Sequence, residues 1–369
     1  MANMNHMFTC PTNIFRKGFD MSIIFRKGFD MSMKRMFGIL LLWLLLVGCA
    51  FSSEQVASQG WTYSDGTLTI YTDEAFSSVD LSPENKVQRL CIEEGVTVWR
   101  KMAQVDLSDL KEIRLPSSLK RIERYAGYKI LIPMIIPLNV ETIEPFALPR
   151  SLDLVTISNE NPYLLLIDGF LIKREAGMLI QCDERYYNTV ETLIIPEGVK
   201  IIGEDAISEM PGIKTIQLPN TIERICRSGI VELDNLESIS LPSSLKYIED
   251  EVFCSCDKLL SLTLPNGICF DMHNDEDYVF YQSVKRLVFE GDFYYSYTPF
   301  SHAWQIEQIV FLGEKPSAID LERVFSTIEH GTVYYLKDNI STWAIDGETT
   351  LCGMPLIMID SIDDLPPIE

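Results

Sequence analysis

The feature that most constrains this chain is a proline that returns every 23 residues, at Pro196, Pro219, Pro242 and Pro265. Apolar residues recur in step with it: six, three and one residues before each proline, three residues after it and, in three of the units, six after it. A fixed period of this length with one short apolar strand per unit is typical of a leucine-rich-repeat solenoid. Each unit is too short to enclose a core alone, so the units before and after must cover it.

The local spacing predicts how each unit folds. The apolar positions three and one before the proline are two apart, which places them on one face of a β-strand. Proline cannot donate a hydrogen bond to the ladder, so it ends the strand. Stacked units therefore predict a parallel β-sheet on one face of the solenoid and short irregular or helical turns on the other. In this register we expect four side chains to be buried in consecutive units: Ile216, Leu218, Ile239 and Leu241.

Weaker units extend the repeat in both directions. The position of the proline is held upstream by Glu93, Pro116, Pro137 and Ser158, and downstream by Glu290 and Leu312. The interval from Ser158 to Pro196 exceeds one period by 15 residues. Residues 161–180 fit there as two strands about a Glu175–Gly177 turn, a hairpin bulging from the coil. Residues 61–71 predict another hairpin, with Asp65 and Gly66 at its turn, that caps the first unit.

The beginning of the chain reads as a signal for export. Lys34 and Arg35 precede an apolar run at 39–47 that is too short for a transmembrane helix. The run ends in Leu-Val-Gly-Cys, which resembles the lipobox of bacterial lipoproteins, so we expect Cys49 to carry the lipid. A simple signal peptide with an unrelated cysteine is the alternative. Residues 1–32 contain a tandem copy of IFRKGFDMS, and we expect translation to start at Met33 or nearby.

These observations predict one solenoid domain with short flanking segments. We expect a doubtful leader at 1–32, a lipoprotein signal peptide at 33–48, a linker and N-terminal cap at 49–83, the solenoid at 84–332 with its hairpin insertion at about 159–183, a C-terminal cap at 333–358 and a frayed acidic tail at 359–369.

Several classes of function find little support in the residues. A net charge of −22 disfavours nucleic acid, whose phosphates need clustered Lys and Arg. The histidines stand apart from one another, and the motifs of serine hydrolases, zinc proteases, P-loops and dinucleotide-binding folds are absent from the sequence. The seven cysteines after Cys49 are odd in number and lack zinc-site spacing, so most of them are expected in the core or in turns. The acidic stretch at 271–277 lacks EF-hand spacing and reads as a solvated loop. We expect no enzyme, no cofactor and no metal.

The unit LESISLPSSLKYIEDEVF at 236–253, together with NPYLLLIDGFLIKREAGMLI at 161–180, resembles the BspA-type leucine-rich-repeat family of bacterial surface proteins. The resemblance covers roughly residues 84–345. It implies display on the bacterial cell envelope and binding or adhesion to a protein partner, such as host matrix or another cell surface, without catalysis. Combined with Cys49, it predicts a module attached to the outer membrane through lipid alone, facing either outward or into the periplasm. The alternative is a carbohydrate-binding lipoprotein of a glycan-uptake system or, further removed, a glycoside hydrolase.

We expect the partner to bind the outward, concave face of the sheet, at positions four and two before the proline. The four central units place eight uncharged residues there: Thr192, Thr215, Ser238 and Ser261 in one column, and Ile194, Gln217, Ser240 and Thr263 in the other. Such a ladder offers hydrogen bonds without the desolvation cost of ions. The alternative is that small residues simply fit a crowded sheet. Arg114 and Arg286, at the outer ends of these columns, are expected to orient an acidic ligand.

A second candidate surface is a run of aromatic residues between 278 and 304. Exposed aromatic patches bind proteins or sugars, whereas buried rings would fill irregular units near the cap. The run comprises Tyr278, Phe280, Tyr281, Phe289, Phe293, Tyr294, Tyr295, Tyr297, Phe300 and Trp304.

Overall fold

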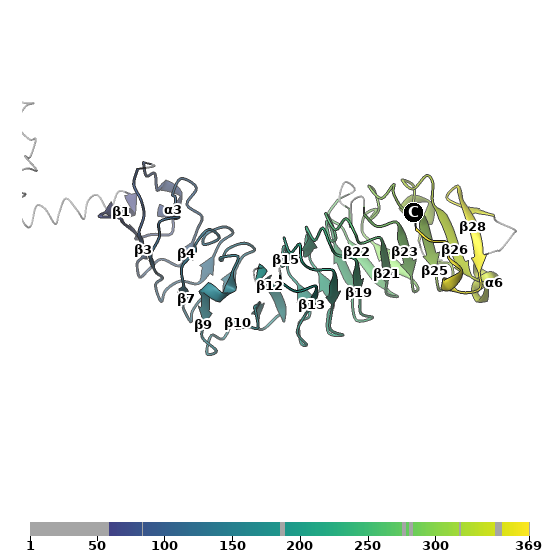
Figure 1. Ribbon diagram of the computed structural model, residues 1–369, viewed down its shortest axis with the longest axis horizontal. Coiled ribbons are helices and arrows are strands. Elements are labelled where there is room, and N and C mark those ends of the chain that lie inside the picture. The colour runs from purple at the N-terminus through teal and green to yellow at the C-terminus, as the bar shows by residue number, and fades with distance from the viewer. Residues whose placement is uncertain are drawn as a thin grey trace, which may run out of the picture. The chain divides into compact units, whose positions relative to one another are not determined.

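The computed structural model describes residues 59–82, 84–184, 189–274, 278–279, 283–316, 319–343 and 349–368. The expected leader, signal peptide and Cys49 lie outside these residues. Residues 60–369 form one compact unit, a stack of short strands in which successive turns of chain lie side by side (Figure 1). Across the described ranges, no helix is long and apolar enough to cross a lipid bilayer.

The first column of strands is the predicted parallel sheet. Its strands pair in parallel as β3–β5, β7–β9, β13–β16–β19 and β21–β23–β25–β26–β28. In register, Leu193 lies beside Ile216 and Ile216 beside Ile239, so neighbours on the sheet are 23 residues apart in sequence. The strands are β3 (Arg89–Ile92), β5 (Glu112–Arg114), β7 (Met134–Ile136), β9 (Val155–Ile157), β13 (Thr192–Ile194), β16 (Thr215–Gln217), β19 (Ser238–Ser240), β21 (Ser261–Leu264), β23 (Arg286–Phe289), β25 (Gln308–Phe311), β26 (Thr332–Leu336) and β28 (Met354–Ile359).

The side of the solenoid that was expected to hold irregular or helical turns carries a second column of parallel strands. Six of the eight contain the apolar residue that follows the proline position by six, such as Ile202 and Ile225, which are fully buried. In β22 and β24 the aligned residues, Phe270 and Tyr295, follow that position by five. They are β4 (Val98–Trp99), β6 (Arg121–Ile122), β8 (Thr142–Ile143), β14 (Ile201–Ile202), β17 (Arg224–Ile225), β20 (Tyr247–Glu249), β22 (Ile268–Asp271) and β24 (Phe293–Tyr295). The short pair β15 (Ile207–Ser208) and β18 (Ile230–Val231) completes the central turns.

Helical elements within the described residues are single turns. The α-helical ones are α3 (Ala75–Ser78), α5 (Leu321–Val324) and α6 (Ile340–Trp343), and the 3-10 turns include η1 (Leu152–Leu154), η2 (Lys337–Asn339) and η4 (Ile362–Asp364).

The interior confirms the strand register and refines the expected burial. Ile216 is fully buried, as predicted. Leu218, Ile239 and Leu241 are only partly buried against the same core. Leu218 and Leu241 follow directly after the last residue of β16 and β19, where the chain turns away at the proline, so their side chains are covered from fewer directions.

The insertion has three strands where the sequence predicted two. β10 (Leu164–Ile167), β11 (Phe170–Lys173) and β12 (Met178–Cys182) pair antiparallel, and β12 then pairs in parallel with β14. The additional turn is Asp168–Gly169, whose φ angles of 48° and 75° suit a two-residue hairpin. The insertion therefore joins the second sheet instead of bulging from the coil.

The insertion also lies between two hydrophobic cores. Leu171 and Ile180 pack into the core of the N-terminal turns. Ile172 and Leu179, the neighbours of these residues along the two strands, pack into the core of the central and C-terminal turns. Side chains alternate across a strand, so β11 and β12 each cover both cores.

The two ends of the solenoid are closed in different ways. β1 (Trp61–Ser64) and β2 (Thr67–Ile70) form the predicted N-terminal hairpin, with φ angles of 47° at Asp65 and 74° at Gly66. At the other end β26 and β28 continue the first sheet, and β27 (Thr350–Leu351) pairs antiparallel with β28. The expected frayed tail is ordered instead: Ser361 caps η4 through a capping box, and the following residues return to the sheet.

Candidate binding surface

The outward face of β13, β16, β19 and β21 carries the predicted uncharged columns. Strand pairing aligns Thr192, Thr215 and Ser238 in one column and Ile194, Gln217 and Ser240 in the other. Seven of the eight positions are exposed and Thr215 is half-buried, while the residues between them in sequence, such as Leu193, Ile216 and Leu262, are buried. The eight side chains therefore line one solvent-facing surface, called the hydroxyl ladder below, which includes Ser261 and Thr263 on β21.

The hydroxyl ladder is uncharged, but its edge is not. Thr215 Oγ1 and Ser238 Oγ lie 3.1 Å apart and share a hydrogen bond, so these hydroxyls partly satisfy each other. Directly before the strands, Lys214 Nζ lies 2.6 Å from Glu191 Oε1. A partner on the ladder would thus exchange neutral hydrogen bonds and meet ion pairs only at the rim, which keeps the desolvation cost low. Ile194, which is 60% exposed, adds one apolar contact.

The two arginines differ in their surroundings. Arg114 is exposed on β5, among the N-terminal turns beyond the insertion. Arg286 Nη2 donates a hydrogen bond to the carbonyl oxygen of Pro366 at 2.6 Å, and its Nε donates to Gln308 Oε1 at 2.6 Å. In this structure the guanidinium of Arg286 therefore binds the chain's own C-terminal segment, and the role of Arg286 in orienting an acidic ligand stays a prediction.

The same face changes from polar to apolar toward the C-terminal turns, which the repeat pattern did not predict. The position two before the proline is polar and exposed at Gln217, Ser240 and Thr263. It becomes apolar and buried at Val288 and Val310, which pack in a separate small cluster on this face. The switch from polar side chains to valine at an outward position was the signal in the sequence.

The aromatic run divides between core and surface. Phe289, Phe293 and Phe300 are at most 1% exposed and pack against other rings, as the core-filling alternative expected. Tyr294, Tyr297 and Trp304 are exposed. Phe280 and Tyr281 lie outside the described residues.

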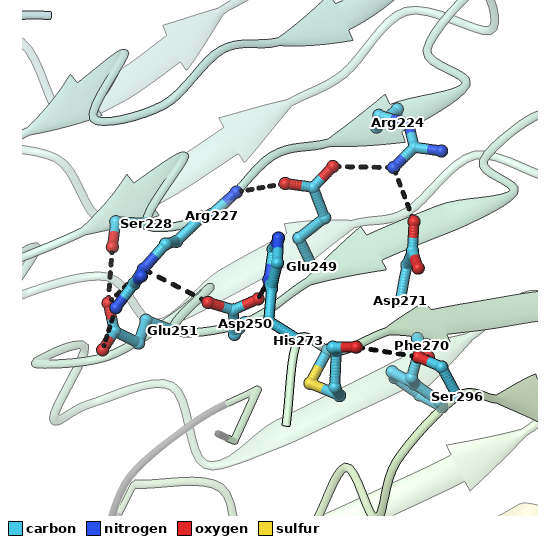
Figure 2. Close-up of polar contacts among 11 residues, drawn as sticks. Arg224, Arg227, Ser228, Glu249, Asp250, Glu251, Phe270, Asp271, His273 and Ser296 are labelled. Atoms are coloured by element: carbon cyan, nitrogen blue, oxygen red, sulfur yellow. Dashed lines mark hydrogen bonds and ion pairs between the residues drawn. The ribbon is translucent and has the colours of Figure 1, made fainter. Parts of the chain in front are cut away.

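A second candidate, a network of charged side chains, lies on the outer side of the second sheet (Figure 2). The Arg224 guanidinium stands between two carboxylates, with Nη1 2.6 Å from Glu249 Oε1 and 3.0 Å from Asp271 Oδ2. The ring of Tyr247 lies 4.2 Å from the same guanidinium. These residues come from the successive strands β17, β20 and β22, so the network joins turns of the solenoid.

The next residues along each turn continue the network around a buried carboxylate. Asp250 is fully buried; Arg227 Nε lies 3.2 Å from its Oδ2, and His273 Nδ1 contacts its Oδ1. Arg227 Nη2 also lies 3.0 Å from Glu251 Oε1. Each of the four carboxylates contacts one of the two arginines, and these contacts between turns support the stacking.

A pocket of about 530 Å³ beside this network is the place where chemistry would be sought. Burial raises the pKa of the Cys226 thiol in its lining to about 12 and keeps this thiol protonated at neutral pH. The pocket is lined by Thr142, Ile143, Glu144, Pro145, Met178, Ile180, Gly203, Glu204, Cys226, Arg227, Glu249 and His273.

The remaining metal-binding and redox groups in the described part of the chain are dispersed. The seven cysteines found there are free thiols, and two of them, Cys182 and Cys256, are buried. In the same residues, three or more His, Cys, Asp or Glu side chains nowhere converge in a way that could hold a metal ion.

Among solved structures, the pneumococcal vaccine antigen PcpA matches with a TM-score of 0.52 and 16% identity, over 81% of this chain and 87% of that one. A leucine-rich cell surface protein of Faecalibacterium prausnitzii matches with a TM-score of 0.45 and 21% identity, over 76% of this chain and 66% of that one. A leucine-rich-repeat protein of Eubacterium ventriosum matches with a TM-score of 0.40 and 13% identity, over 73% of this chain and 81% of that one. A comparison with curated protein sequences finds no match.

The repeat shows the family of this chain, because a family model matches it directly. The model of the BspA type leucine-rich repeat region matches in 6 copies over residues 65–164 and 180–290, more than half of the chain. The two matched ranges are separated by the segment that carries β10 and β11, the insertion between the two cores. The chain belongs to the BspA-type leucine-rich-repeat family.

Proposed function

We propose that this protein is a non-catalytic binding or adhesion module of the bacterial cell surface, and that it recognises a protein partner through the hydroxyl ladder. The observation that carries the proposal is the contrast in charge. The chain has a net charge of −22, yet eight neighbouring outward positions are free of charge. Neutral hydroxyls lose less on desolvation than ions do, so they suit a surface that must exchange water for a partner.

Parallel stacking supports this use of the ladder. Strands pair residue for residue, so each hydroxyl column presents donors and acceptors at the regular spacing between neighbouring strands, about 4.8 Å. The strands are fixed by a buried core, and their outward side chains are therefore held in place before a partner arrives. Preorganisation of this kind reduces the entropic cost of binding.

The proposal includes attachment through Cys49. An exported protein held by a lipidated N-terminus would present the solenoid to matrix proteins or to other cells. Several acyl chains are needed for firm anchoring, which the modification of a lipoprotein cysteine supplies.

The alternative partner is a glycan, and the exposed rings are the observation that favours it. Tyr294 and Trp304 are 52% and 58% exposed, and ring faces of this kind stack on sugars. A carbohydrate-binding protein of an uptake system would use these rings and leave the ladder without a role.

The test exposes the full-length protein to arrays of immobilised extracellular-matrix proteins and of glycans. The double variant Thr215→Arg with Ser240→Arg places two bulky charges on the ladder. Asn220→Arg with Ser243→Arg is the matched control, because it adds the same charges at exposed positions in the turns that follow the strands. We expect a matrix protein to bind the wild type and the control but not the ladder variant. Binding to glycans alone, lost on Tyr294→Ala and kept by the ladder variant, would overturn the proposal in favour of the alternative.

A further inference from the structure

The outward face changes from open to covered between β21 and β23. Thr263 on β21 is exposed, whereas Val288, its partner on β23, is 2% exposed. The next residues in that column, Val310 and Tyr334, are 0% and 7% exposed. All of these side chains point away from the main core, so something on the outside must cover the last three.

Part of the cover is the C-terminal segment at residues 361–368, called the strap; Ile359 belongs to the same cluster, and Leu312 and Leu336 also pack against it. Leu365 packs against the cluster that contains Val288, Val310 and Tyr334. The carbonyl oxygen of Pro366 accepts two hydrogen bonds, from Arg286 Nη2 at 2.6 Å and from Gln308 Nε2 at 3.0 Å. Figure 1 accordingly marks the C-terminus beside β23.

The strap thus uses both columns of the face in a defined way. The column formed by residues two before the proline position, here Val288 and Val310, receives the apolar side chain of Leu365. The column formed by residues four before that position, here Arg286 and Gln308, binds the backbone carbonyl of Pro366. These two donors are linked to each other, because Arg286 Nε donates to Gln308 Oε1 at 2.6 Å, and they form one preset cradle.

The sequence of the strap fits this cradle chemically. The face offers hydrogen-bond donors and apolar surface, and the backbone N–H groups of the strap at Leu365 and after it need few acceptors from the face. Leu365 N–H is already bonded to the carbonyl of Ile362 within the 3-10 turn, and Pro366 and Pro367 have no N–H to satisfy. A peptide that offers a leucine after such a turn and then two prolines therefore leaves no backbone donor unpaired at these three residues when it docks.

The strap is also held by few contacts, so it can dissociate from the face. The contacts named above are one apolar side chain and two hydrogen bonds, against the conformational entropy of ordering a whole terminal segment. The strap lies outside the β26–β28 ladder, whose last pair is Leu336 with Ile359, so its release breaks none of the ladders that join the turns.

We propose that β23, β25 and β26 form a docking lane for a peptide that, like the strap, places a leucine and a following proline carbonyl after a 3-10 turn, and that the strap occupies this lane in cis until such a segment of a partner protein displaces it. The inference rests on the proposed function in that both place recognition on the outward face. It concerns different residues from the hydroxyl ladder.

The test measures, by fluorescence anisotropy, the binding of the labelled peptide SIDDLPPI to full-length protein. Leu365→Asp should release the strap, since a carboxylate is not tolerated in the apolar cluster. Ile362→Asp is the matched control, because Ile362 is 42% exposed on the same strap. A tethered strap competes at an effective concentration in the millimolar range, so we expect Leu365→Asp to bind the peptide at least about tenfold more tightly than wild type and Ile362→Asp. Leu365→Ala should give an intermediate affinity and serves if the aspartate variant fails to fold.

Specificity is checked with a peptide in which the leucine is aspartate and with the variant Arg286→Met in the released background, both of which should lose binding. Equal affinities of wild type and released protein, or no binding of the peptide to folded released protein at about 1 mM, would overturn the proposal. The ladder variant Thr215→Arg with Ser240→Arg should bind the peptide normally when combined with Leu365→Asp. Failure of the ladder proposal therefore leaves this result intact, and the reverse also holds.

Discussion

Replacing Ile216 by alanine tests the register on which the binding surface depends. Ile216 is fully buried on β16, between Leu193 on one neighbouring strand and Ile239 on the other. The change removes about three carbon atoms from contact with the core, which at about 0.8 kcal/mol each costs about 2.4 kcal/mol of transfer free energy. The cavity left between rigid strands adds about 1 kcal/mol. We expect the free energy of unfolding to fall by about 3 to 4 kcal/mol.

The adjacent Gln217 supplies the control. Its side chain is exposed on the hydroxyl ladder, so Gln217→Ala should change the free energy of unfolding by no more than about 0.5 kcal/mol. Urea denaturation of the full-length variants, followed by circular dichroism, measures both changes. A slip of one residue in register would exchange the faces of the strand. Similar losses for the two variants, or a larger loss for Gln217→Ala, would refute the reasoning and with it the position of the ladder.

Three further predictions concern other parts of the chain. Burial raises the pKa of Glu184 to about 7 despite nearby Arg150, so the folded state binds more protons than the unfolded state between about pH 4.5 and pH 7. The free energy of unfolding should therefore fall as the pH rises through this range. Melting temperatures measured across the range should show this fall for the wild type and a flatter profile for Glu184→Gln. Gly203→Ala would place a methyl group 2.5 Å from the carbonyl oxygen of Leu179 and should lower stability by about 1 to 3 kcal/mol in urea denaturation. Mass spectrometry of the purified protein should show acylated Cys49 as its N-terminus, and an unmodified N-terminus would contradict the lipid anchor.

The sequence predicted the first sheet well because the signal was local and repeated. Proline ends each central strand, and the buried residue three before it recurs in four consecutive units, as Leu193 and Ile216 illustrate. The second sheet was missed because its central strands are as short as two residues with one buried side chain, such as Ile202, which is too little to show a period of two. Hydrogen bonds between turns, for example from Glu223 N to Lys200 O at 2.7 Å, make them strands.

The sequence could predict only those parts of the candidate site that follow from the alignment of neighbouring repeat units. The hydroxyl ladder follows directly from register. The docking of the strap depends on Arg286 meeting Pro366, which lies 80 residues away in sequence. A short acidic segment with two prolines reads as a frayed tail when considered alone. Its stabilising contacts exist only after β23, β25 and β26 have assembled, so no local pattern could reveal them.

The position of the insertion has a consequence for cooperativity. Alternate residues of β11 and β12 close one core on each side, so each half of the solenoid has its own hydrophobic interior. Coupling between the halves then depends on the insertion and on polar bridges across it, such as Arg124 Nη1 to Asp205 Oδ2 at 2.9 Å. In a stack stabilised by nearest-neighbour contacts, such a seam separates two folding units. We therefore expect damage to the N-terminal turns to stop at the insertion, so that the turns that carry the hydroxyl ladder remain folded beyond it.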